Sequence, residues 1–241
     1  MKPLFFLTVL FLFSLSAFAD KHGKHLFILS GQSNMQGHRP EEAFIPMVNK
    51  AFGNENVIVV QDALGGQPIY RWYKKWRHPE GDSAETKPES TGDLYDRLMG
   101  KVRTTIKNQR VLSVSFVWMQ GERDAKMGWG KIYEKALIGL HNQLANDLKW
   151  KENDIGFVIG RLSDFDMDNK RYPHWTIIRD VQERVSNSKK NFLLVNTDDL
   201  NDGFNRKGKA IKDDLHYSAE GYKILGHRFA EACIQIIKNK K

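Results

Sequence analysis

Short, nearly continuous apolar runs rich in β-branched residues recur along the chain. The five runs are His25–Ser30, Val57–Gln61, Leu112–Met119, Ile155–Gly160 and Phe192–Asn196. Runs of this length and composition are typical of parallel strands that are covered on both faces. The pattern therefore predicts a parallel sheet of five strands.

Segments of helical period separate these runs. Apolar residues recur on one helical face between Ile132 and Leu148, and again between Tyr222 and Ile236. The segments 94–106 and 175–185 are expected helices with a less regular apolar stripe. Ser218, just before the last helical pattern, is the expected N-cap of that helix.

Strands and helices that alternate in this way predict an α/β fold, in which a doubly wound parallel sheet carries helices on both faces. Ligands of such sheets bind beyond the carboxyl ends of the strands. We therefore expect the chemistry of this protein just after the apolar runs.

The first twenty residues have a different pattern. Lys2 precedes an apolar run from Leu4 to Phe13, and small residues follow at Ser16–Ala19. This arrangement predicts a signal peptide over residues 1–19, cleaved after Ala19, and an exported protein that is periplasmic or secreted. The alternative is a retained anchor, but the run is short for a span of about 20 residues.

The remaining residues, 20–241, are long and apolar enough to form one domain with one core. Cys233 is the only cysteine, so the chain forms no internal disulfide, and a buried thiol is expected. The formal charge of +8 comes from scattered Lys and Arg residues, which argues against a nucleic-acid partner. An acidic glycan remains an alternative partner for this basic surface.

Two motifs at opposite ends of the chain carry candidate chemistry. Gly31–Gly37, with the sequence GQSNMQG, follows the first apolar run and places Ser33 just beyond the carboxyl end of the first predicted strand. Asp213, Asp214, Leu215 and His216 precede the last helix. A serine hydroxyl needs a base such as histidine, and the base needs a carboxylate that holds its tautomer. The spacing predicts Ser33 as nucleophile, His216 as base and Asp213 as its partner, with Asp214 as a surface or capping residue.

The second and third apolar runs lead into two further motifs, GGQPI from Gly65 and WMQGERDA from Trp118. Acyl transfer builds negative charge on a carbonyl oxygen, and this charge needs preorganised donors about 3 Å away. The backbone N–H of Ser33, that of Gly65 or Gly66, and the amide of Gln120 are candidate donors. Which of the two glycines donates stays open.

These four motifs together resemble the SGNH hydrolases, and more narrowly the group of sialate O-acetylesterases and acetylxylan esterases, carbohydrate esterase family six. The resemblance runs from about His25 to Ala232 through GQSNM, GGQPI, WMQGERDA and DDLHYSAEGY. It implies a three-layer α/β/α sandwich of the flavodoxin-like type. It also implies removal of O-acetyl groups from carbohydrate without a cofactor, by the residues just named. The third block of the wider SGNH pattern carries an Asn, whereas this chain has QGE.

Other residues are candidates for supporting roles. Gln32, Asn34 and Glu122 flank the motif residues and are expected to brace the site. Arg71, Trp72 and Trp76 are candidates for a substrate cleft, because aromatic rings stack on sugars and cations bind carboxylates. The alternative for the two tryptophans, four residues apart, is one buried face.

Asp164–Asn169 resembles the start of a calcium loop, but Asn169 and Trp175 stand where an EF-hand needs Gly and Glu. No metal site is predicted. The resemblance leaves the acetylated sugar undetermined. Two alternatives remain: a lipolytic or thioester hydrolase acting on longer acyl esters, and a glycan-binding protein without activity.

Overall fold

The computed structural model describes residues 23–81, 88 and 90–239. The predicted signal peptide, residues 1–19, lies outside the described residues, so its cleavage stays a prediction. In the part of the chain that is described, no helix has both the length and the apolar character needed to cross a membrane.

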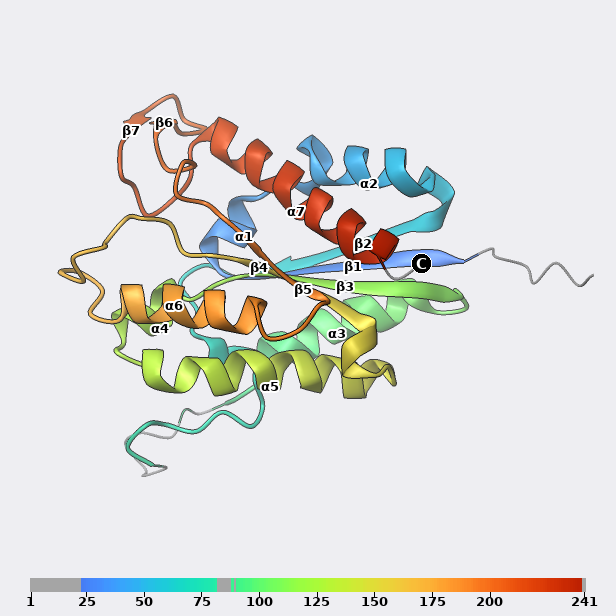
Figure 1. Cartoon of the computed structure of the whole chain (residues 1–241), viewed down its shortest axis with the longest axis horizontal. Helices are drawn as coiled ribbons and strands as arrows, with labels where there is room; N and C mark the ends of the chain where they lie inside the picture. Colours follow the sequence, from blue (N-terminus) through green and yellow to red (C-terminus); the bar gives the residue numbers. More distant parts are fainter. Residues whose placement is uncertain (1–22, 82–87, 89, 240–241) are drawn as a thin grey trace, which may run out of the picture.

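The five predicted strands form one parallel sheet, which confirms the expected α/β fold (Figure 1). Along the sheet the order is β2-β1-β3-β4-β5. The strands are β1 (Lys24–Gly31), β2 (Val57–Ala63), β3 (Val111–Met119), β4 (Ile155–Gly160) and β5 (Phe192–Val195). Each run of apolar residues is therefore a strand, with bounds that differ from the prediction by at most two residues.

Helices cover both faces of the sheet, and the molecule has the three layers of an α/β/α sandwich (Figure 1). On one face lie α2 (Phe44–Phe52) and α7 (Ala219–Asn239), and on the other lie α3 (Asp93–Ile106), α5 (Gly130–Leu148) and α6 (Trp175–Ser186). All four predicted helices are confirmed. Ser218 accepts the backbone N–H of Gly221 on its Oγ at 3.0 Å, which confirms it as the cap of α7.

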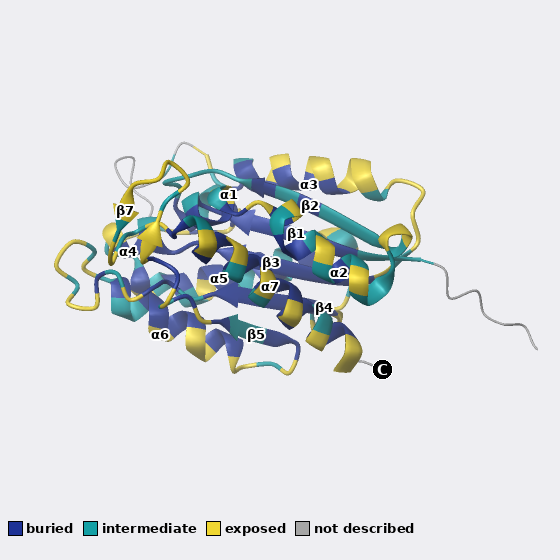
Figure 2. Ribbon diagram, turned by 90° about the horizontal axis from the view of Figure 1, so that it is seen from above, coloured by how far each residue is buried: buried dark blue, intermediate teal, exposed yellow. Residues whose placement is uncertain are grey.

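The sheet lies in the core, and the outer faces of the helices are exposed (Figure 2). Aromatic residues fill the space between the layers, as in the stacked pair Phe116 and Phe157, whose ring centroids are 5.3 Å apart. Cys233 is fully buried, as its place in the apolar stripe of α7 predicts. Burial of these apolar surfaces is the main source of stability in such a domain.

Short elements after the strands were not predicted from the sequence. They are α1 (Ser33–Gly37), α4 (Glu122–Lys126) and a small antiparallel ribbon of β6 (Gly203–Phe204) and β7 (Ala210–Ile211). The helix α2 was also not predicted, because its apolar stripe is short and Pro46 interrupts the pattern.

The carboxyl ends of β2, β1 and β3, which are neighbours in the sheet, lie level with one another. Gly31 at the end of β1 pairs with Ala63 of β2 and with Met119 of β3. The motifs that follow these strands therefore begin side by side, at the point where the strand order reverses. Gly31 has a φ of 144°, and a Cβ there would lie 1.9 Å from the carbonyl oxygen of Met119, so only glycine fits.

Candidate active site

Ser33 is the first residue of α1, directly beyond the end of β1, and it is partly exposed. It lines a cavity of about 370 Å³, a size that suits small-molecule ligands. The cavity is lined by Gln32, Ser33, Gly65, Gly66, Glu122, Arg123, Lys126, Tyr172, Leu215 and His216. Residues that follow β1, β2 and β3, together with the loop before α7, thus meet in one hollow.

His216 reaches this cavity from the loop that precedes α7, and a buried asparagine ties that loop to the nucleophile motif. Asn34 donates from Nδ2 to the carbonyl oxygen of Leu215 at 3.1 Å and to Glu122 Oε1 at 2.9 Å. The hydroxyl of Tyr222 donates to Asn34 Oδ1 at 3.1 Å. Asn34, the residue after Ser33, therefore holds the backbone at Leu215, the residue before His216.

The carboxylate nearest to His216 is that of Asp214. His216 Nδ1 lies 3.9 Å from Asp214 Oδ1, and the same oxygen accepts the backbone N–H of His216 at 2.9 Å. Asp213 is exposed, has a left-handed backbone with a φ of 47°, and donates its N–H to Asp202 Oδ1. Among the described residues, no hydrogen bond joins the carboxylate of Asp213 to His216. Asp213 as the partner of the base stays a prediction.

Gly65 lies beside Ser33, closer than Gly66. A Cβ placed on Gly65 would be 3.5 Å from Cβ of Ser33, whereas one on Gly66 would meet only the guanidinium of Arg123, at 3.6 Å. The N–H of Gly65 donates to Gln36 Oε1 at 2.9 Å. This N–H is thus held by an exposed side-chain carbonyl, the kind of acceptor that a substrate oxygen can replace.

Gln120 is fully buried and does not line the cavity. Its Nε2 donates to Asp124 Oδ2 at 2.5 Å and to the carbonyl oxygen of Gln67 at 3.1 Å, and its Oε1 accepts the hydroxyl of Tyr133 at 3.0 Å. Both ends of this amide are therefore occupied. The structure does not place Gln120 beside Ser33 as an oxyanion donor.

Two further predicted supporting residues are buried at the cavity wall. Gln32 accepts the backbone N–H of Arg123 on Oε1 at 3.2 Å and the amide of Gln120 at 3.3 Å. Glu122 is 1% exposed, and burial raises its pKa to about 7, while the hydrogen bond from Asn34 opposes this rise. Its second oxygen, Oε2, has no hydrogen-bond partner in the described part of the chain. These positions suit the bracing role that the sequence predicts.

The predicted substrate cleft at Arg71, Trp72 and Trp76 is wrong for this structure. Trp72 is 1% exposed and packs edge-on against Trp118, and Trp76 is 3% exposed. Arg71 binds both carboxylate oxygens of Asp93, at 2.7 and 2.6 Å. The tryptophans serve the core and the arginine is already paired, so none of the three is available to a sugar in the cavity.

Sequence reasoning assigned no role to four residues that line the cavity: Arg123, Lys126, Tyr172 and Leu215. The first two belong to α4, inside or next to the QGERDA motif, so the motif itself was the available signal. Tyr172 comes from the loop before α6, where Asp166 Oδ2 accepts the backbone N–H groups of Arg171 and Tyr172, at 3.0 and 2.7 Å. The acidic segment that resembles a calcium loop thus positions this tyrosine. Within the described ranges, no cluster of three metal-binding side chains occurs.

Solved structures with the same fold include several esterases. A protein from Arabidopsis thaliana is 17% identical, with a TM-score of 0.65, and the match covers 89% of this chain and 99% of that one. A carbohydrate acetylesterase from Xanthomonas citri is 14% identical, with a TM-score of 0.62, over 90% of this chain and 57% of that one. A carbohydrate acetylesterase family member from Sinorhizobium meliloti is 14% identical, with a TM-score of 0.52, over 89% and 99%. At these identities the likeness shows the fold.

No curated protein matches the chain significantly. A family model does: residues 36–235 match the family described as carbohydrate esterase, sialic acid-specific acetylesterase. The match covers most of the chain, and it confirms the resemblance on which the sequence prediction rests. The chain therefore belongs to this family of carbohydrate esterases, and it is a hydrolase of the carbohydrate acetylesterase type.

Proposed function

We propose that the protein removes O-acetyl groups from carbohydrate by serine catalysis, with Ser33 as the nucleophile. The observation that carries this proposal is that Ser33 and His216, from opposite ends of the chain, line one cavity at the switch point of the sheet. The sugar is proposed to be an acetylated sialic acid or another acetylated glycan. The family description, which names sialic acid, and the acetylesterases of the same fold support this choice.

In the first step, His216 takes the proton of Ser33, whose Oγ attacks the carbonyl carbon of the acetyl group. The tetrahedral intermediate collapses, the bond from the carbonyl carbon to the sugar oxygen breaks, and this oxygen leaves with the proton from His216. Water, deprotonated by His216, then attacks the carbonyl carbon of the acetyl group on Ser33; the bond from this carbon to Oγ breaks, Oγ takes back the proton from His216, and acetate leaves. Asp213 is the proposed carboxylate partner, and it would need to turn toward the imidazole from its exposed position.

Two backbone N–H groups are the proposed oxyanion donors, those of Ser33 and Gly65. Gly65 is favoured over Gly66 because it lies beside Ser33. The carbonyl oxygen of the substrate would replace Gln36 Oε1 on the N–H of Gly65. Gln120 would act as a third donor only after its amide left Asp124 and Gln67. We therefore propose that Gln120 chiefly holds the loops around the cavity in place.

The predicted signal peptide leads to the further proposal that the enzyme acts outside the cytoplasm, on glycans that it meets in the periplasm or the medium.

The test is acetate release by the purified protein from O-acetylated sialic acid and from acetylxylan, with a Ser33→Ala variant in parallel. We expect release by the wild type and a loss of at least about a thousandfold in kcat in the variant, as for other serine hydrolases. A folded Ser33→Ala protein that keeps full activity would refute the assignment. Faster cleavage of long-chain esters than of acetyl esters would favour a lipolytic enzyme.

A further inference from the structure

Two cationic side chains, those of Arg123 and Lys126, line the candidate catalytic cavity, and neither is paired with a carboxylate of the described chain. Arg123 and Lys126 belong to α4, which begins directly after β3 and Gly121. Among the described residues, neither forms an ion pair of 4.0 Å or less. Other cations of the protein differ: Arg71 holds Asp93, and Arg228 holds both carboxylate oxygens of Asp199.

The position of Arg123 is fixed without use of its terminal nitrogens. Its Nε donates to the carbonyl oxygen of Gly66 at 2.7 Å, and its backbone N–H donates to Gln32 Oε1 at 3.2 Å. No hydrogen bond from Nη1 or Nη2 to the described part of the chain is formed. Nη1 and Nη2, which together can bind both oxygens of a carboxylate, are thus available next to the loop that carries Gly65.

Lys126 lies on the same short helix, and its Nζ is 5.8 Å from the centre of the Tyr172 ring. Lys126 is exposed, and Tyr172 is partly exposed at the cavity. A ring and a cation at one side of a hollow suit a sugar that carries a negative charge, because the ring packs on the sugar face.

The carboxylates that line the cavity do not neutralise the charges of Arg123 and Lys126. Among the described residues that line the cavity, Glu122 alone carries a carboxylate, which is buried and accepts a hydrogen bond from Asn34. Burial raises the pKa of Glu122 to about 7, so its charge is partial at neutral pH. The cavity therefore keeps a net positive character that a ligand can neutralise.

We propose that Arg123 and Lys126 form an anion subsite, which binds the carboxylate of an acetylated acidic sugar and selects it over neutral sugars. This inference rests on the proposed function and adds to it the residues that determine specificity. The substrate class is an O-acetylated sugar acid, of the sialic or uronic type. Arg71, which sequence reasoning had considered for this role, is paired with Asp93 instead.

A subsite of this kind changes mainly the binding of the substrate. The carboxylate lies away from the reacting carbonyl and keeps its charge through the reaction, so its contacts act equally on ground state and transition state. We expect the effect in KM rather than in kcat. Because both cations are partly open to solvent, the preference should weaken as ionic strength rises.

The experiment compares kcat/KM for 9-O-acetylated sialic acid with that for its C1 methyl ester, which has the same acetyl group and no carboxylate charge. We expect the wild type to prefer the acid by about tenfold, the factor that corresponds to about 1.4 kcal/mol. The variants Arg123→Gln and Lys126→Gln should each lower this ratio at least threefold, through KM. Because Lys126 is exposed, its variant tests the subsite even if Arg123→Gln folds poorly.

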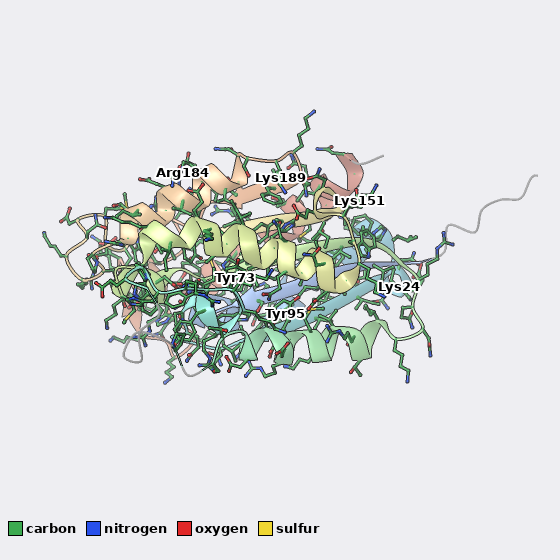
Figure 3. The ribbon with its side chains drawn as sticks, turned by 90° about the horizontal axis from the view of Figure 1, so that it is seen from below. Lys24, Tyr73, Tyr95, Lys151, Arg184 and Lys189 are labelled. Atoms are coloured by element: carbon green, nitrogen blue, oxygen red, sulfur yellow. The ribbon has the colours of Figure 1, made fainter. Side chains whose placement is uncertain are left out.

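Lys151→Gln is the matched control. This lysine is exposed and lies just before β4, at the end of the sheet opposite the cavity (Figure 3). It carries the same charge, and its loss should leave the ratio unchanged. A wild type that cleaves both substrates equally, or variants that keep the full preference, would overturn the anion subsite and leave the proposed esterase intact. Failure to release acetate from either substrate would overturn the proposed function itself.

Discussion

At the scale of single residues, the choice between two neighbouring aspartates is the sharpest question that the site poses. The spacing in DDLH favours Asp213 as the partner of His216, whereas the structure brings Asp214 nearer, at 3.9 Å from Nδ1. Asp214 already accepts the backbone N–H of His216, which is a capping role. The two carboxylates therefore predict different outcomes when each is neutralised.

We expect Asp213→Asn to lower kcat by about a hundredfold or more, because the imidazole loses the carboxylate that holds its tautomer. Asp214→Asn should cost less than about tenfold, since an amide oxygen still accepts the N–H of His216. Asn tolerates the left-handed backbone at position 213, so the first change keeps the loop conformation. Steady-state kinetics on an acetyl ester measure both. A larger loss in Asp214→Asn would make Asp214 the partner of the base.

The buried carboxyl of Glu122 makes stability depend on pH. Burial raises its pKa from 4.5 to about 7, so the folded state binds its proton more tightly than the unfolded chain. This contribution to stability is fully present below pH 4.5 and is lost as pH rises through about 7. Asp124, buried nearby, has a pKa raised to about 7 for the same reason and adds an effect of the same sign.

Glu122→Gln should therefore gain stability relative to the wild type as pH rises from 4.5 to 8, by about 3 kcal/mol in total. Urea unfolding of both proteins at several pH values measures the difference. A difference between the two proteins that stays constant over this pH range would show that Glu122 ionises normally.

At the scale of elements, the end of β1 shows how a single backbone position shapes the site. Gly31 closes β1 in a conformation with a φ of 144°, and its α-carbon faces the carbonyl oxygen of Met119. The next residues turn directly into α1 and place Ser33 at its first position. A side chain at position 31 would push β1 away from β3 and move the nucleophile.

We expect Gly31→Ala to lower the free energy of unfolding by roughly 3 kcal/mol or more, from steric overlap and backbone strain together. Gly100→Ala is the control, because a Cβ at that helical position meets no atom within 4 Å. It should be neutral or add about 0.5 to 1 kcal/mol. Urea unfolding compares the two, and equal effects would contradict the close approach of β1 and β3.

The strands and long helices could be predicted because each is defined by a long local pattern, as in Ile155–Gly160, which is a strand with those bounds. For Trp72 the sequence left a substrate cleft and a buried face as alternatives, because its burial depends on packing against Trp118 from a distant strand. The cations of α4 were missed for a related reason. Arg123 takes its position from Gly66, which a loop after another strand supplies. Motifs thus indicate which loops meet, and long-range packing decides which side chains face the cavity.

At the scale of the whole molecule, the strand order decides where the motifs meet. The strand β1 lies between β2 and β3, so the loops after these three strands surround Ser33, and α7 brings the loop of His216 to the same edge. Asn34, which follows β1, joins these segments because it donates hydrogen bonds to Glu122 after β3 and to Leu215 before α7. The site is therefore a product of the fold as a whole, because the segments that line it all follow the carboxyl ends of strands of the parallel sheet.

The assignment of Ser33 as nucleophile is tested most directly by covalent labelling of the purified protein with a fluorophosphonate, which reacts with activated serines, followed by peptide mass spectrometry. We expect one adduct, on Ser33, and at least about a hundredfold slower labelling in a His216→Ala variant, because the serine loses its base. An adduct on another residue, or full acetylesterase activity in a protein whose Ser33 is fully labelled, would contradict it.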